Sequence, residues 1–163
     1  MTDAAAPSAR PPRAVEWLYY LVAILFAAVL LAYYWTGEGG PALLAFGLLP
    51  VAFVLYTLEA LRKNEFYPGL PAAARYAVAG IYVTISIVVA VYMVVEYEAI
   101  GTVRAGTWNT ADLTMGPLMA LLIMEYARQR YLALFILNII LILYAVYGHV
   151  VPGMFFHPGL SWE

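Results

Sequence analysis

The two histidines, His149 and His157, are the side chains best suited to hold a metal ion or a haem. Both lie near the end of the sequence, where Pro–Gly pairs at 152–153 and 158–159 break any helix around them. Haem ligation by two histidines needs facing positions at one depth, and a catalytic zinc ion takes three protein ligands. Neither set is present, and the sequence has no cysteine. We therefore expect no metal, haem or other cofactor in this chain, and interpret both histidines as contact residues on the outer side of a membrane.

Polar side chains are scarce inside the apolar segments. Ser86 has no histidine or lysine base in its own segment, so a nucleophilic site is not indicated. The hydroxyl groups of Thr84 and Ser86 can instead bond back to their own helix. Asn138 lies near the middle of its segment, where an amide needs a partner on a neighbouring helix. We interpret Asn138 as a helix-packing residue, with a direct role in transport as the alternative, and expect no enzymatic activity.

Charged side chains stand at the ends of the apolar segments, where ion pairs are the simplest interpretation. Glu125 and Arg128 are one helical turn apart, and their pairing would fix the bend between two segments. Contact with a partner subunit is the alternative role for Glu125, Arg128 and Arg130. Glu59 precedes two basic residues at the third and fourth following positions, and we expect it to pair with one of them.

The composition shows what surrounds these residues. Of 163 residues, 65% are hydrophobic and only 11% are charged, against about 25% charged in an ordinary soluble domain. A soluble domain of this size needs a polar surface that this sequence does not supply. The eight basic residues form no dense cluster and the net charge is −2, which argues against nucleic-acid binding. The composition excludes a soluble enzyme and a disordered linker, and indicates membrane lipid as the surroundings.

Five apolar segments divide the sequence. A helix that crosses a bilayer core of about 30 Å needs about 20 residues, and 111–127 is the segment closest to the lower limit. The sequence predicts an all-α integral membrane protein, a bundle of about five transmembrane helices; the alternative is four transmembrane helices plus one interfacial helix. We expect a disordered tail at 1–14, one helical domain at 15–151 and a short tail at 152–163. The predicted spans are 15–35, 41–61, 76–97, 111–127 and 131–151.

Lysine and arginine indicate the orientation, because they favour the cytoplasmic side of short loops. With five spans, seven of them fall on one side and only Arg104 on the other. If 111–127 lay on the surface instead, the counts would be five and three. The bias favours five spans, with the N-terminus in the cytoplasm and the C-terminus outside. The seven residues are Arg10, Arg13, Arg62, Lys63, Arg75, Arg128 and Arg130.

Small residues four positions apart indicate helix packing. Gly80 with Thr84, and Gly116 with Ala120, would let neighbouring helices approach closely. Pro50 lies inside the second apolar segment, where a proline removes one backbone hydrogen bond, so we expect a kink there. These features are typical of a chain that packs against other helices.

The last third of the sequence resembles a known family. Glu125-Tyr126-Ala127-Arg128 is followed by Tyr144-Ala145-Val146-Tyr147-Gly148, then by Pro152-Gly153 and His157-Pro158-Gly159, with Asp112-Leu113 upstream. This order is similar to the small (Q-type) membrane subunit of tripartite ATP-independent periplasmic (TRAP) transporters, in particular the TAXI-type branch. The resemblance is specific over 107–163, whereas over 15–106 it rests on the number and spacing of spans.

The resemblance implies a non-catalytic scaffold subunit in a bacterial inner membrane, with 152–163 in the periplasm. A large permease subunit of about twelve spans would bind the coupling ions, usually sodium, and move like an elevator. A periplasmic binding protein would deliver an organic acid, and His149 and His157 are candidate contacts on that side. Fused relatives continue past the region that matches 157–163, so we expect the large subunit to be another polypeptide. A stand-alone channel or membrane enzyme is the alternative.

Overall fold

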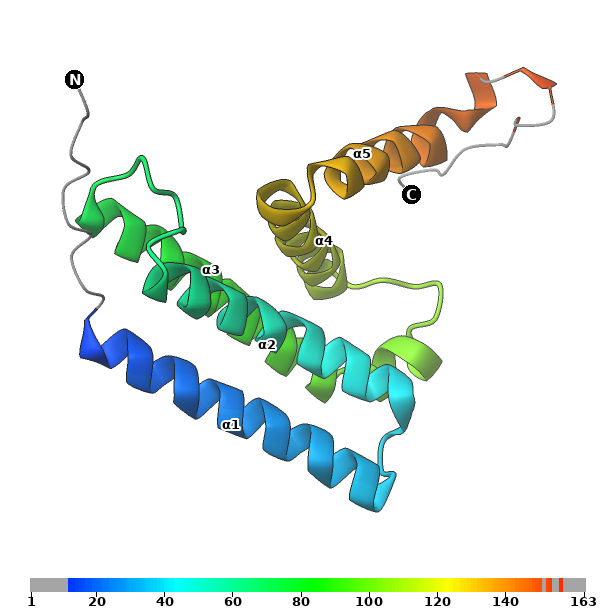
Figure 1. Ribbon diagram of the computed structural model, residues 1–163. Coiled ribbons are helices and arrows are strands. Elements are labelled where there is room, and N and C mark those ends of the chain that lie inside the picture. Colours follow the sequence, from blue (N-terminus) through cyan, green and yellow to red (C-terminus); the bar gives the residue numbers. More distant parts are fainter. Residues whose placement is uncertain (1–11, 151, 154–155, 157–163) are drawn as a thin grey trace, which may run out of the picture. The chain divides into compact units, whose positions relative to one another are not determined.

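The computed structural model describes residues 12–150, 152–153 and 156, and over these residues the chain is helical without strands (Figure 1). The predicted all-α fold is therefore confirmed. His157 and the rest of the expected C-terminal tail at 157–163 lie outside the described residues. The elements are α1 (Arg13–Thr36), α2 (Gly40–Arg62), α3 (Ala72–Val95), η1 (Ala99–Val103), α4 (Thr110–Arg130), α5 (Leu132–Tyr147) and η2 (Gly148–Val150).

Four helical segments in the described part are long and apolar enough to cross a membrane: α1, α2, α3 and Leu132–Val150. They correspond to the predicted spans 15–35, 41–61, 76–97 and 131–151. The remaining predicted span, 111–127, does form a helix, α4, but α4 is less apolar because it contains both Asp112 and Glu125. A multi-pass membrane protein follows from the four apolar helices, and a fifth crossing by α4 stays a prediction.

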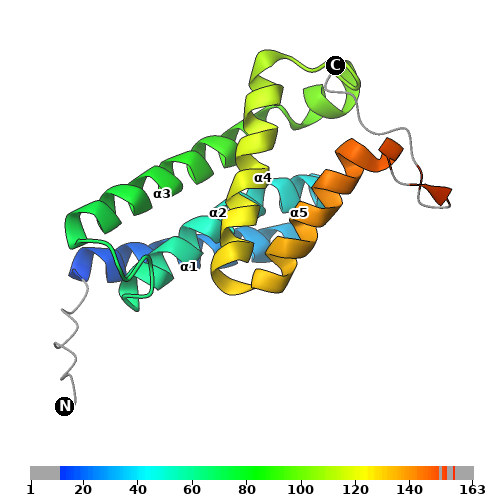
Figure 2. The same ribbon diagram turned by 90° about the horizontal axis from the view of Figure 1, so that it is seen from above.

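The chain forms two compact units, Met1–Met119 and Ala120–Glu163. In the first unit, α1, α2 and α3 run up and down in chain order, and α2 contacts both α1 and α3 (Figure 1, Figure 2). The central position of α2 explains its burial, since Phe53, Val54 and Leu58 are all buried whereas α1 has no buried residue. α2 is therefore the central helix of the first unit, and both α1 and α3 pack against it.

Glycines make the tight turn between α1 and α2. Gly37 ends α1 in the left-handed region at φ 67°, and its N–H donates to the carbonyl of Tyr33. Gly39 and Gly40 follow at φ 82° and 72°, a backbone conformation that residues with a Cβ rarely adopt. Pro41 then stands in the first turn of α2, where a missing N–H costs no hydrogen bond.

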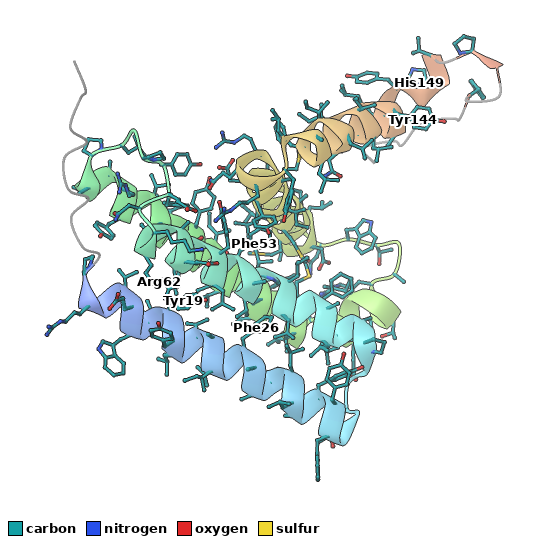
Figure 3. The ribbon with its side chains drawn as sticks, in the orientation of Figure 1. Tyr19, Phe26, Phe53, Arg62, Tyr144 and His149 are labelled. Carbon is teal, nitrogen blue, oxygen red and sulfur yellow. The ribbon has the colours of Figure 1, made fainter. Side chains whose placement is uncertain are left out.

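Arg62 joins α1 to α2 at the opposite end of the first unit. Its guanidinium lies 4.5 Å from the ring centroid of Tyr19, and it donates a 3.1 Å hydrogen bond to the hydroxyl of Tyr20. Figure 3 shows Tyr19 and Arg62 side by side between the two helices. Glu59 pairs with Lys63 across 2.7 Å, which confirms the predicted ion pair at this end of α2. Whereas Lys63 pairs with Glu59, Arg62 binds the aromatic rings of Tyr19 and Tyr20 on α1.

The loop between α2 and α3 is folded back onto the helices. Asn64 leaves α2 in the left-handed conformation at φ 57°, and the N–H of Phe66 donates to the carbonyl of Ala60. Phe66 is only 1% exposed and belongs to a cluster with Ala60, Leu61 and Ala79. The predicted spans leave 62–75 as a connection, and Phe66 in that connection is among the most buried of the described residues.

The α2–α3 contact depends on a close approach near Gly47. A Cβ at Gly47 would lie 2.8 Å from Cγ2 of Val94, so the two helices touch where this glycine has no side chain. Pro50, one turn further along, is buried, and α2 continues on both sides of it. Thr57 on α2 and Ser86 on α3 are the buried polar residues of these two helices. The interface is therefore almost wholly apolar.

Several predicted boundaries are wrong. α3 begins at Ala72, four residues before the predicted start of the third span at 76. Arg13 and Ala14, expected in the disordered tail, form the first turn of α1, because Pro12 sets the φ of −56° that precedes a helix. Residues 128–130, expected as a connection, are the last turn of α4. Because arginine and glutamine have high helix propensity, α4 continues through Arg130 and ends before Tyr131, whose φ is −141°.

Replacing Phe66 by alanine is expected to release the loop from the α2–α3 pair. A buried Phe-to-Ala change costs about 3–5 kcal/mol, and the anchor of the loop is lost with it. Trypsin should then cut after Lys63 several-fold faster in detergent. Leu70→Ala is the matched control, because Leu70 is only partly buried in the same loop. Equal cleavage rates in both variants would contradict the anchoring role.

Candidate functional site

A network of charged side chains connects the end of α3 to the beginning of α4. The hydroxyl of Tyr92 donates to Oδ1 of Asp112 at 2.7 Å. Arg104 lies between two carboxylates: its Nε is 3.1 Å from Oδ2 of Asp112, and its Nη2 is 2.8 Å from Oε2 of Glu96. The Asp112 side chain is only 5% exposed, so its charge depends on these partners. All four residues belong to the first unit.

The beginning of α4 has a reciprocal cap. Asn109 precedes the helix, and its Oδ1 accepts a 2.7 Å hydrogen bond from the N–H of Asp112. Oδ2 of Asp112 in turn accepts from the N–H of Asn109 at 3.1 Å. This pairing is the capping-box arrangement, with asparagine and aspartate in place of serine and glutamate. The cap holds Asp112 in position for Arg104 and Tyr92.

A short π-helical turn, η1, brings Arg104 back to the network. The N–H of Arg104 donates to the carbonyl of Ala99 at 2.8 Å, which closes the wide turn. The hydroxyl of Thr102 donates to the carbonyl of Glu98 at 2.6 Å. The predicted spans 76–97 and 111–127 leave 98–110 as a connection. Its first part is helical, because these hydrogen bonds satisfy the backbone there.

The network favours the ionised forms of both its central groups. The hydrogen bond from Tyr92 lowers the pKa of Asp112, and the positive charge of Arg104 lowers it further. Partial burial lowers the pKa of Arg104, but the hydrogen bond with Glu96 and the nearby negative charges raise it above its usual range. At neutral pH, Asp112 and Arg104 therefore form a charged pair outside the four apolar helices.

A cavity of about 580 Å³ lies beside the network in the first unit. Aromatic side chains from three elements form much of its wall, and the rings of Phe46 on α2 and Tyr97 after α3 are 6.2 Å apart. Trp108 and the acidic residues Glu98 and Asp112 also line it. Its volume is in the range of small-molecule sites, about 300–1,000 Å³. This cavity is the most site-like feature of the described residues.

The predicted ion pair at the end of α4 is confirmed. Arg128 binds Glu125 in bidentate fashion, with Nε 2.8 Å from Oε2 and Nη2 2.6 Å from Oε1. The amide of Gln129 donates to the same carboxylate. Glu125 is 20% exposed and Arg128 43%, and Arg130 is exposed at the last residue of α4. The carboxylate of Glu125 therefore stabilises the last turn of α4 directly before the break at Tyr131.

The other predicted contact residues are not gathered into one site. Gly80 and Thr84 lie exposed on α3, and Ala120 is exposed on α4, whereas Gly116 lines the cavity. Asn138 is half-buried on α5, and His149 is exposed in η2, at the end of α5 in Figure 3. Within the described part of the chain, no three histidine, aspartate or glutamate side chains form a group that could hold a metal ion.

The network around Arg104 was not predicted from the sequence, although part of its signal was present there. Asn109 and Asp112, three residues apart before an apolar run, are a capping signature. Tyr92 and Glu96 belong to another segment, and their approach to Asp112 depends on the turn at η1.

No protein-family model, curated protein or solved structure matches this chain.

The network is expected to resist acid because the pKa of Asp112 is lowered. Its contribution to stability is present above the ordinary aspartate pKa of about 3.9 and is lost as the pH falls through the lower folded value. Tyr92→Phe removes the largest cause of that lowering, so the network should open at a higher pH. Quenching of Trp108 fluorescence by acrylamide measures the opening. Tyr82→Phe, on the same helix, is the control, and identical midpoints in both variants would contradict the assignment.

Proposed function

We propose that this chain is a non-catalytic scaffold subunit of a membrane transport complex. The observation that carries the proposal is the exposure of its apolar helices. Neither α1 nor α5 has a buried residue, and Leu31 and Leu132 are 71% and 61% exposed. Helices with so little burial in their own chain need lipid or other helices around them. The chain therefore offers a large apolar surface for partners.

The distribution of polar groups also supports a passive role. Ionisable side chains inside a membrane mark ion and substrate paths. In this chain the ion pairs stand at helix ends: Glu59 with Lys63, Arg104 with Asp112, and Glu125 with Arg128. Thr57 and Ser86, the polar residues buried in the apolar helices α2 and α3, carry no charge. A path for an ion would therefore have to be formed mainly by another subunit.

The resemblance to TRAP transporters gives this scaffold a specific partner. The partner is a large elevator-type permease of about twelve spans that couples uptake of organic acids to sodium and receives them from a periplasmic binding protein. The N-terminus lies in the cytoplasm of a bacterial cell and α5 leads to the periplasmic side. Two features support this assignment: the order of residues over 107–163 and the confirmed pair of Glu125 with Arg128.

Three described features are suited to contact with that permease. Gly80 and Thr84 leave an exposed small-residue face on α3, where another helix could approach closely. Asn138 is half-buried on α5, and an amide in a membrane helix bonds across to a neighbour. Glu125 holds the last turn of α4 before the break that leads to α5. We assign contact to these positions as part of the proposal.

Glu125→Ala is expected to lower assembly with the permease. When the chain is co-expressed with its twelve-span partner, the recovered complex should fall by about fivefold or more, because the guanidinium of Arg128 loses its carboxylate at the contact. Co-purification in mild detergent measures the amount of complex. Glu59→Ala is the matched control, since Glu59 forms a similar pair with Lys63 at the end of α2.

Two outcomes would contradict the proposal. If Glu125→Ala leaves assembly unchanged and abolishes transport alone, Glu125 acts in the transport path and not in the scaffold. If the unaltered chain never co-purifies with a large permease and conducts ions or performs a reaction alone in liposomes, it is a channel or a membrane enzyme.

A further inference from the structure

The cavity beside the Arg104 network has walls of two kinds. Phe46, Tyr97 and Trp108 present aromatic rings from α2, from the end of α3 and from the approach to α4. Met93 and Ile100 add apolar surface. A ligand that fills this space must therefore have an apolar body. Because the aromatic faces carry negative partial charge, they also favour a cation placed over them.

The charges at the cavity have an acidic excess. The carboxylate of Asp112 is already paired with Arg104, and both its oxygens accept hydrogen bonds. Glu98 also lines the cavity and is exposed, and no described side chain donates to its carboxylate. Arg104, the one basic residue between Arg75 and Arg128 in the sequence, is committed to Glu96 and Asp112. A positive charge on the ligand would pair with the carboxylate of Glu98.

The geometry points to an ammonium-bearing amphiphile as the ligand of this cavity. Its apolar chain would lie between Phe46, Trp108 and the wall at Gly116, and its ammonium group would lie against Glu98 and the ring of Tyr97. Aromatic rings combined with a carboxylate are the chemistry that recognises organic ammonium groups. An anionic amphiphile would meet the unbalanced charge of Glu98, and a neutral one would gain nothing from it.

The position of the cavity supports an amphiphile. Its lining includes Tyr92 and Met93 in the last turn of the apolar helix α3, and the polar residues Glu98 and Thr102 beyond the end of that helix. The wall thus combines apolar and polar surface where an apolar helix ends, as in the boundary region of a membrane. A molecule with an apolar body and a charged head matches this combination of surfaces.

Gly116 leaves open space on the α4 side of the cavity. A Cβ built at Gly116 would meet no atom within 4 Å, so the wall there is open. A leucine at this position is expected to project into the cavity and to occupy the space of the ligand. Gly80 provides a matched control, because it is also a helical glycine with open space around a Cβ but does not line the cavity.

Binding can be measured with Trp108 as the reporter. The chain is kept in a neutral maltoside detergent and titrated with a bromine-labelled long-chain primary amine, and then with a phosphatidylethanolamine that carries a brominated acyl chain. Trp108→Phe identifies the part of the quenching that arises in the cavity. We expect saturable quenching of Trp108, with an affinity about tenfold higher for the amine than for a brominated alkyl sulfate of the same length.

Two variants separate the charge from the space. Glu98→Gln is expected to weaken amine binding about tenfold, and Glu38→Gln, an exposed carboxylate in the α1–α2 turn, is expected to leave it unchanged. Gly116→Leu should abolish saturable quenching of Trp108, whereas Gly80→Leu should not. Because Glu98 is exposed, its substitution keeps the test informative even if Gly116→Leu disturbs folding.

The probes also identify the source of the ligand. Quenching by the amine but not by the phosphatidylethanolamine assigns the cavity to a soluble amine, and quenching by the phosphatidylethanolamine, with or without the amine, assigns it to a membrane lipid. Either result supports the proposal. Equal binding of the amine and the sulfate, an unchanged affinity in Glu98→Gln, or no saturable quenching by either cationic probe would overturn it.

Discussion

The absence of water from a bilayer is the constraint on which this structure depends. Backbone N–H and C=O groups there must be paired within the protein, so the apolar segments form helices. Charged side chains are costly at the same depth, so they lie at the helix ends. Each described connection must then satisfy its own polar groups at the membrane boundary. The α1–α2 turn does so with glycines, and the other connections do so with ion pairs and caps.

These connections give the molecule its local order. Phe66 buries itself beside α2 and α3, and Arg75 donates to the carbonyls of Pro68 and Leu70 in the same loop. Arg104 joins the end of α3 to the beginning of α4 through Glu96 and Asp112. Such contacts fix segments that have little apolar burial of their own. They also leave many apolar side chains of the helices exposed.

The proposed scaffold and the proposed cavity ligand follow from the same distribution of residues. Apolar side chains face outward along the spans, which suits a subunit that is surrounded by other helices and lipid. Aromatic and acidic side chains meet where α3 ends, which suits an amphiphile with a cationic head. Neither role requires a charge inside the membrane, and each can fail without the other.

The sequence by itself determined the helical membrane fold, four of the apolar spans and the ion pairs of Glu59 and Glu125, because these depend on composition and on residues within one helical turn. The first turns of α1 and α3 and the last turn of α4 were misjudged by two to four residues, since helix ends depend on local hydrogen bonds. Only the tertiary structure brought Tyr92 and Arg104 to Asp112 and opened the cavity beside Gly116. The reason is physical: these residues are distant along the chain, and their approach is set by the turn at η1 and the packing of α2 on α3.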